Sequence, residues 1–240
     1  TPLYSSAASD VYKRQILGPL TNPASADSMV VGVAEYELLK QYKEILSKLG
    51  CKKAIIVHGE KGLDEITTVG DTHVESIGLE FPRKINSESM GLKESSSDDI
   101  KGEGIETNAK IMYQVLAGKL PNNNPIVQSV AANAGAGLLV GEKVDSIKEG
   151  IAIATETIEN GKALNKLIEL RQKLKDRAPK NSIFDPPHST LQIGGIFGGI
   201  AHNVIADKCF VNWETRPVVK EDGVFLNTEL DKYTNEVLLP

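Results

Sequence analysis

A short apolar run followed directly by an acidic loop, within residues 53–67, most constrains how this chain can fold. Residues 54–57 read Ala-Ile-Ile-Val, end at a His-Gly step, and precede the adjacent carboxylates Asp64 and Glu65. Such a run is typical of a buried strand in a parallel sheet, and ligands of α/β sheets bind where these strands end. The pattern predicts two carboxylates where a phosphate-bound magnesium ion would be useful. The alternative is a solvated acidic turn, because Asp and Glu are mostly exposed.

The overall composition restricts the class of protein and the class of partner. The 240 residues suffice for one large domain or two small ones, and the net charge of −5 comes without a basic block. No apolar run approaches the ~20 residues that a membrane-spanning helix needs. Its two cysteines, Cys51 and Cys209, form no disulfide framework and fit a reducing cytosol. We therefore expect a cytoplasmic protein with no nucleic-acid partner and no membrane partner.

Turn-forming residues dominate the stretch 16–24. Gly18 and Pro19, and then Asn22 and Pro23, form two breaker dipeptides on a short apolar stem. Proline fixes the backbone and glycine allows close approach. The stretch is therefore predicted to be a rigid loop suited to line a pocket.

Three further patterns frame the acidic loop. Residues 29–33 predict a strand, and residues 35–49 predict an amphipathic helix because their apolar residues recur at a spacing of three to four. Gly50 is a natural end for that helix. Residues 72–77 alternate and predict another strand, so the acidic loop is expected to lie between two strands.

The first part of the chain resembles the anthranilate phosphoribosyltransferase family. The motifs that carry the resemblance are ILGPLTNPA, VVGV, LGCKKAIIVHGEKGLDEIT, VGDTHV and NAKIMYQVLAG, and the segment VAANAGAGLLV resembles a helix of that family. The resemblance implies a partial nucleoside-phosphorylase-like α/β domain. It also implies transfer of a 5-phosphoribosyl group from phosphoribosyl pyrophosphate (PRPP) to anthranilate in tryptophan biosynthesis.

The same resemblance assigns site residues. Asp64 and Glu65 correspond to the pair that binds Mg²⁺, the implied cofactor. The implied substrate-binding residues of the anthranilate channel are Gly18, Pro19, Asn22 and Pro23. Asn108 and Asn133 lie on expected helices, where their side chains cap or pack, and neither is assigned a role in the site. The family's Gly-Thr-Gly-Gly-Asp phosphate loop is missing from this sequence, so we expect impaired activity.

The second part of the chain shows a different pattern. Residues 164–174 continue as an amphipathic helix. Residues 189–196 and 208–216 alternate and are joined by a glycine-rich connection, which predicts an antiparallel pair of strands. Residues 225–239 predict a closing helix.

This second part resembles the dimerisation domain of the zinc-dependent enzyme acetylornithine deacetylase. The resemblance rests on SIFDPPHSTLQIGGIFGGIAHNVIADKCFVNWETRPV and implies a ferredoxin-like α+β fragment. It implies that Asn203 and Arg216 bind substrate oxygen atoms; alternatively, Asn203 holds a turn and Arg216 pairs with an acid such as Glu214. The family's zinc ligands lie outside this segment, so no zinc is expected. As an alternative function, the chain is a deacetylase fragment of arginine biosynthesis that acts only as a dimerisation module in a homodimer.

The two resemblances predict three segments. Residues 1–15 resemble an adapter or cloning scar, residues 16–162 are the transferase-like domain, and residues 163–240 are the deacetylase-like fragment. The junction is expected within 161–176, with one helix near 150–176 joining the parts. A chimera is the simplest account. The alternatives are a genuine fusion and an assembly artefact with no activity.

Overall fold

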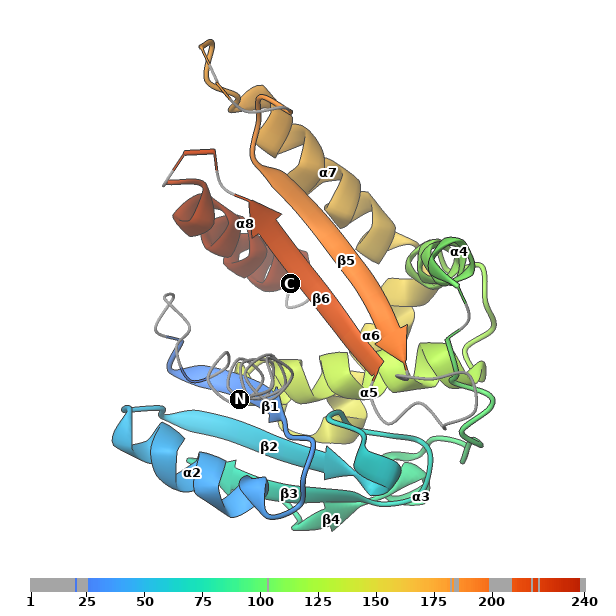
Figure 1. Ribbon diagram of the computed structural model, residues 1–240. Helices are drawn as coiled ribbons and strands as arrows, with labels where there is room; N and C mark the ends of the chain where they lie inside the picture. The colour runs from blue at the N-terminus through green and yellow to red at the C-terminus, as the bar shows by residue number, and fades with distance from the viewer. Residues whose placement is uncertain are drawn as a thin grey trace, which may run out of the picture. The chain divides into compact units, whose positions relative to one another are not determined.

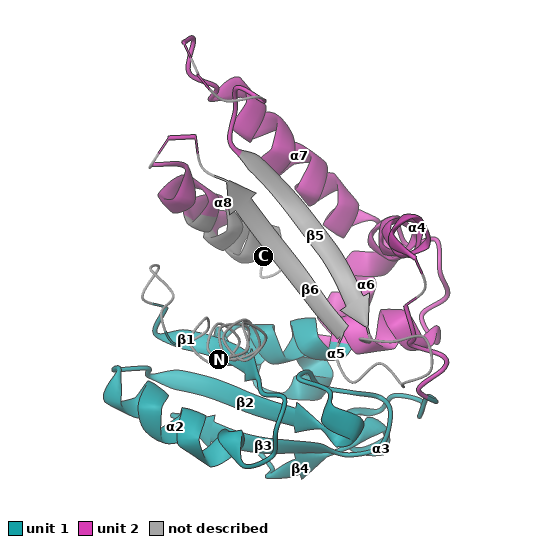
Figure 2. Cartoon of the chain, in the orientation of Figure 1, with its two compact units in different colours: residues 1–96, 132–150 teal, residues 97–131, 151–240 magenta. Residues whose placement is uncertain are grey.

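The computed structural model describes most of the chain (Figure 1). The described residues are 20, 26–102, 104–181, 183, 186–198, 209–216, 218–219 and 221–237. The chain divides into two compact units, each made of two separate stretches (Figure 2). Unit 1 comprises Thr1–Ser96 and Ala132–Gly150, and unit 2 comprises Ser97–Ala131 and Ile151–Pro240. The sequence-based division after residue 162 follows family resemblance and stays a prediction.

Unit 1 holds a sheet with the strand order β1-β2-β3-β4. Its strands are β1 (Ser28–Gly32), β2 (Lys53–Gly59), β3 (Thr72–Ile77) and β4 (Lys84–Ile85). Strand β1 runs parallel to β2, with Gly32 opposite Val57, whereas β3 runs antiparallel to β2. The sheet is therefore mixed, and the prediction of a parallel sheet is wrong for every described pair except β1–β2.

The connection after β2 explains this mixed pairing. Between β2 and β3 the chain forms only the 3₁₀ helix η2 (Glu60–Gly62) and loop. A parallel neighbour requires a crossover connection, usually an α-helix, and this stretch contains none. The chain therefore turns back beside β2. Strand β2 is nevertheless buried as expected, because the side chains of residues 54–57 are all 0% exposed.

Helix α2 (Leu38–Lys48) packs against the β1–β2 pair. Its buried residues are Leu39, Tyr42 and Leu46, at the spacing that places them on one face. Burying each of these leucines contributes roughly 1.5–3 kcal/mol. Gly50 adopts a φ of +85° just after the helix, which is the backbone conformation that glycine allows at this position.

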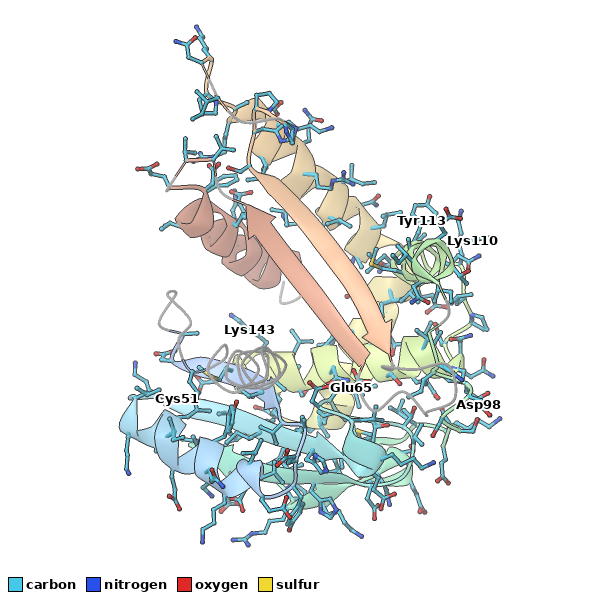
Figure 3. All side chains as sticks on the ribbon, viewed as in Figure 1. Cys51, Glu65, Asp98, Lys110, Tyr113 and Lys143 are labelled. Carbon is cyan, nitrogen blue, oxygen red and sulfur yellow. The ribbon has the colours of Figure 1, made fainter. Side chains whose placement is uncertain are left out.

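Cys51 lies between α2 and β2 (Figure 3). Its Sγ donates weak hydrogen bonds to the carbonyl oxygens of Lys53, at 3.3 Å, and Asp27, at 3.4 Å. Burial raises the pKa of the thiol, and the nearby Asp27 carboxylate adds to this effect. The thiolate is therefore disfavoured, and Cys51 acts as a packing residue at the start of β2.

The remaining helices complete the two units. Unit 1 contains α3 (Ser87–Met90), and α5 (Pro125–Val140) and α6 (Ile147–Glu159) contribute residues to both units. None of the helices that the structure describes is long and apolar enough to cross a membrane.

Unit 2 contains a two-stranded antiparallel sheet with helices beside it. Its further elements are α4 (Ile105–Leu116), α7 (Lys162–Asp176), β5 (Thr190–Gly198), β6 (Cys209–Arg216) and α8 (Asp222–Val237). The predicted antiparallel pair is confirmed, with a register shift between Ile193 and Gly195. Helix α4 contacts both α7 and β5. The helix of the first segment thus packs with elements of the second.

The expected single helix near residues 150–176 is wrong. The structure has α6 and α7 instead, and Gly161 separates them with a φ of +71°. A left-handed residue interrupts the α-helical backbone, and glycine adopts it without a steric cost. The chain therefore changes direction where the two resemblances meet.

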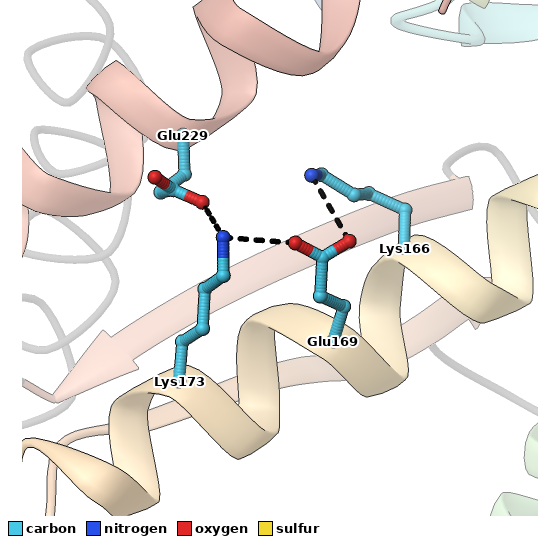
Figure 4. A network of polar contacts seen from close by, with 4 residues as sticks. All are labelled: Lys166, Glu169, Lys173 and Glu229. Atoms are coloured by element: carbon cyan, nitrogen blue, oxygen red, sulfur yellow. Dashed lines mark hydrogen bonds and ion pairs between the residues drawn. The ribbon is translucent and has the colours of Figure 1, made fainter.

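Helices α7 and α8 are joined by an apolar cluster and by polar contacts. The cluster contains Leu170, Leu174 and Leu226. On the surface, Lys173 binds both Glu169 of its own helix and Glu229 of α8, as Figure 4 shows. Lysine contacts lower the pKa of both glutamates, Lys173 most strongly.

A second polar network, around Asp222, is buried. Asp222 is only 1% exposed, and its Oδ1 accepts a hydrogen bond from Arg177 Nε at 2.6 Å. Its Oδ2 accepts from the hydroxyl of Ser189, whose Oγ in turn accepts from the Val218 N–H at 2.8 Å. The Arg177 guanidinium also lies 4.2 Å from the centre of the Phe225 ring. One carboxylate therefore joins α7, α8 and the segments that flank β5 and β6.

Candidate magnesium site

The acidic doublet lies at the carboxyl edge of the parallel strands, as predicted. Strands β1 and β2 end at the same edge of the sheet, and the loop that leaves β2 there carries Asp64 and Glu65. A Cβ atom added to Gly32, the last residue of β1, would lie 1.5 Å from the Asp64 carbonyl oxygen. The backbone of the doublet therefore lies directly over the end of β1. Figure 3 labels Glu65.

The residues on either side of the doublet anchor it. Before it, the Leu63 carbonyl accepts a hydrogen bond from the Gly59 N–H at 2.7 Å. After it, Ile66 is 0% exposed. Asp64 and Glu65 are themselves only partly exposed, so the doublet is not a fully solvated turn.

Asn133 holds the backbone just after the doublet. Its Oδ1 accepts from the Ile66 N–H at 2.9 Å, and its Nδ2 donates to the Ile66 carbonyl at 2.8 Å. Residues 66 and 133 are far apart in sequence, and Asn133 lies within α5. The sequence predicts only a capping or packing role for Asn133. The one signal for its contact with the loop is a polar side chain among the small residues of this helix.

The surroundings of Glu65 disfavour the charged form of its carboxyl group. Burial raises its pKa to about 8, and the neighbouring Asp64 charge adds to the rise. Two adjacent carboxylates at a partly buried edge resist ionising together, and a divalent cation would offset both charges. This donor set fits Mg²⁺.

The number of carboxylates in the doublet also fits Mg²⁺. Within the described part of the chain, no group of three or more His, Cys, Asp or Glu side chains could hold a metal ion. Mg²⁺ is commonly bound by one or two carboxylates together with waters and substrate phosphates, rather than by an all-protein cage. The doublet is therefore suited to a metal that arrives with a phosphorylated substrate.

The raised pKa of Glu65 predicts how stability depends on pH without metal. Below its ordinary value of 4.5 the carboxyl is protonated in both the folded and the unfolded chain. Between pH 4.5 and about 8 only the unfolded chain loses the proton, so the free energy of unfolding is expected to fall as pH rises. Above that range the effect is constant. Urea unfolding of the wild type at several pH values, beside Glu65→Gln, measures this component.

The matched control for this prediction is Glu80→Gln, which changes an exposed glutamate of unit 1. We expect Glu65→Gln to flatten the pH dependence and Glu80→Gln to leave it unchanged. Equal pH profiles for the wild type and Glu65→Gln would show that Glu65 ionises normally.

The other predicted site residues either lie outside the described residues or belong to unit 2. Gly18, Pro19, Asn22, Pro23 and Asn203 lie outside the described residues. Arg216 is the last residue of β6, where its backbone is opposite Thr190. Their substrate-binding roles stay predictions.

Comparison with known families bears on both parts of the chain. Residues 13–164 match the glycosyl transferase family, a/b domain. The chain belongs to this family. Residues 144–240 also match the peptidase dimerisation domain. Both resemblances expected from the sequence are confirmed, and the two matches overlap around α6 and the start of α7.

Individual relatives of this chain support the first match. This chain is 40% identical over 157 residues to anthranilate phosphoribosyltransferase from a Thermoanaerobacter species. The matched residues make up 65% of this chain and 46% of the relative. The enzyme from Clostridium beijerinckii is 38% identical over 181 residues, with 70% and 52% covered. The chain therefore spans about half the length of the curated relatives it matches.

Solved structures give the same result. Anthranilate phosphoribosyltransferase from Thermus thermophilus matches with a TM-score of 0.57 and 39% identity, over 62% of this chain and 44% of that one. The Saccharomyces cerevisiae enzyme in complex with PRPP and Mg matches with a TM-score of 0.51 and 31% identity, over 57% and 38%. These similarities confirm the predicted α/β class of the first part of the chain.

Proposed function

We propose that this chain provides the magnesium-binding part of an anthranilate phosphoribosyltransferase site. The observation that carries the proposal is the position of Asp64 and Glu65, on the loop over the carboxyl ends of β1 and β2. The Saccharomyces cerevisiae relative in complex with PRPP and Mg supports it, because this chain matches that anthranilate phosphoribosyltransferase at 31% identity. The proposed reaction forms a C–N bond between the anthranilate amine and the ribose, and breaks the C–O bond to pyrophosphate.

In this proposal, different residues bind the metal, position its ligands and orient the substrate. The carboxylates of Asp64 and Glu65 would hold the ion, which supplies neutralising charge to the phosphates of the leaving group. The packing of Gly32 and the anchors at Leu63 and Ile66 keep the carboxylates at the sheet edge. The loop that contains Gly18 and Asn22 would orient the planar anthranilate, a task in which shape matters more than charge.

Metal binding by the full chain tests the proposal independently of turnover. Mn²⁺, which prefers the same oxygen ligands, can be titrated while free Mn²⁺ is followed by electron paramagnetic resonance. The double substitution Asp64→Asn with Glu65→Gln is expected to weaken Mn²⁺ binding roughly a hundredfold, because ligand charge sets affinity. Mg²⁺ should compete for the same site.

The chain offers a matched control for the doublet. Asp98 and Asp99 are also adjacent carboxylates, and both are exposed. Changing both to asparagine removes the same charge and is expected to alter Mn²⁺ affinity by about twofold at most in salt, because exposed charges are screened. If the Asp64/Glu65 variant binds Mn²⁺ as tightly as the wild type, the proposal is wrong.

The peptidase dimerisation match supports a second candidate function, self-association through residues 144–240. The described part of that match contains α6, α7 and α8 and the β5–β6 pair. Sedimentation equilibrium of the full chain tests this function, and a monomer at high concentration would exclude it.

A further inference from the structure

Asn133 makes a two-point contact with one peptide unit beside the acidic doublet. Its amide accepts from the Ile66 N–H and donates to the Ile66 carbonyl, at 2.9 Å and 2.8 Å. An asparagine amide has one acceptor and one donor group in the spacing of a backbone partner. It therefore pairs with Ile66 much as a neighbouring strand would, although it belongs to a helix.

With this contact, the backbone is held on both sides of the doublet. Leu63 is tied to Gly59 on one side, and the Asp64 carbonyl lies against Gly32 with no room for a side chain between them. Ile66 is tied to Asn133 on the other side. The backbone is thus held before, at and after the two carboxylates, so their spacing is set by the fold.

Asn133 is itself held firmly within α5. Its neighbours on the helix, Ala132 and Ala136, are both 0% exposed. Small side chains allow a helix backbone to approach other backbone closely, which brings a short amide within reach of the loop. Alanine at position 133 would leave both polar groups of the buried Ile66 without this partner.

We infer that Asn133 is a positioning residue for the cation site: through Ile66 it fixes the geometry of the Asp64 and Glu65 carboxylates. The inference rests on the proposed function, because it concerns the same metal. Residues that orient metal ligands without touching the metal are important for metal affinity. Their removal typically lowers that affinity by about 10- to 100-fold. Asn133→Ala is therefore expected to weaken Mn²⁺ binding by about tenfold or more.

The experiment uses the full chain and separates positioning from general stability. Mn²⁺ titration and thermal unfolding are measured for the wild type, Asn133→Ala and Asn133→Ser, and for the control Asn124→Ala. Asn124 Oδ1 caps the same helix by accepting from the Ile126 N–H at 3.0 Å, and Asn124 belongs to unit 2, whereas the acidic loop belongs to unit 1. Asn133→Ser adds no charge beside the doublet and keeps a short hydroxyl in place of the two-point amide contact, so it remains informative if Asn133→Ala does not fold.

The expected pattern is specific. Both Asn133 variants should weaken Mn²⁺ binding and change the paramagnetic spectrum of the bound ion, whereas Asn124→Ala should lower the Tm with unchanged binding. If the Asn133 variants lower the Tm but bind Mn²⁺ like the wild type, while the Asp64/Glu65 variant does not, the positioning role alone is wrong. If the Asp64/Glu65 variant also binds normally, the proposed function fails and the positioning role with it.

Discussion

Replacing Gly32 with alanine is expected to destabilise unit 1 by about 3 kcal/mol or more, because overpacking against backbone is costly. The added methyl group would lie 1.5 Å from the Asp64 carbonyl oxygen, a distance at which the atoms overlap. The obstacle is backbone rather than a flexible side chain, so the loop itself must move. We therefore expect the same substitution to weaken Mn²⁺ binding by displacing the doublet.

Gly137→Ala is the matched control for this prediction. Gly137 lies within α5 in the same unit, and nothing lies within 4 Å of an added Cβ there. Because alanine favours a helix interior over glycine, this variant should gain up to about 1 kcal/mol. Urea unfolding followed by far-ultraviolet circular dichroism gives both values. A Gly32→Ala variant as stable as the wild type would mean that the acidic loop is not packed on β1.

Replacing Asp222 with alanine is expected to cost unit 2 about 1–3 kcal/mol, the range for leaving a buried polar group, here the Ser189 hydroxyl, without its hydrogen-bond partner. The substitution leaves the Arg177 guanidinium without its 2.6 Å partner and removes the acceptor of the Ser189 hydroxyl. The sole tryptophan of the sequence, Trp213, lies in β6, so its fluorescence reports the unfolding of this unit.

The neighbouring Glu221 provides the control, because it is exposed. Glu221→Ala should change the free energy of unfolding by no more than about 0.5 kcal/mol. Asp222→Asn keeps the size of the side chain and loses the charge. Its loss of unfolding free energy should therefore fall between those of Asp222→Ala and Glu221→Ala. Similar losses for Asp222→Ala and Glu221→Ala would show that the buried network does not stabilise unit 2.

The elements around the site were predictable because their patterns are local. The apolar run at 54–57 and the alternation at 72–77 match β2 and β3, and the turn after the run places the doublet at the end of β2. Residues 35–49 predict α2 from spacing alone. Such patterns report which face of an element is buried, and that is enough to locate a loop at the edge of a sheet.

Other features depend on contacts that no local pattern reports. The antiparallel direction of β3 follows from the missing crossover helix, and the pairing of Asn133 with Ile66 joins distant parts of the chain. The break between α6 and α7 was missed because Gly161 lies in an otherwise helical pattern, where glycine alone is a weak signal. The raised pKa of Glu65 arises from burial, which depends on the folded surroundings.

Because unit 1 takes residues from two stretches of chain, it cannot be shortened at its first boundary without losing part of the site. A polypeptide that stops at residue 96 retains both carboxylates and Gly32 but has no Asn133. Removal of 97–131, in contrast, would keep both carboxylates, Gly32 and Asn133. A shortened protein made for crystallography, or for grafting the proposed ion site, should therefore retain residues 132–150 together with the sheet.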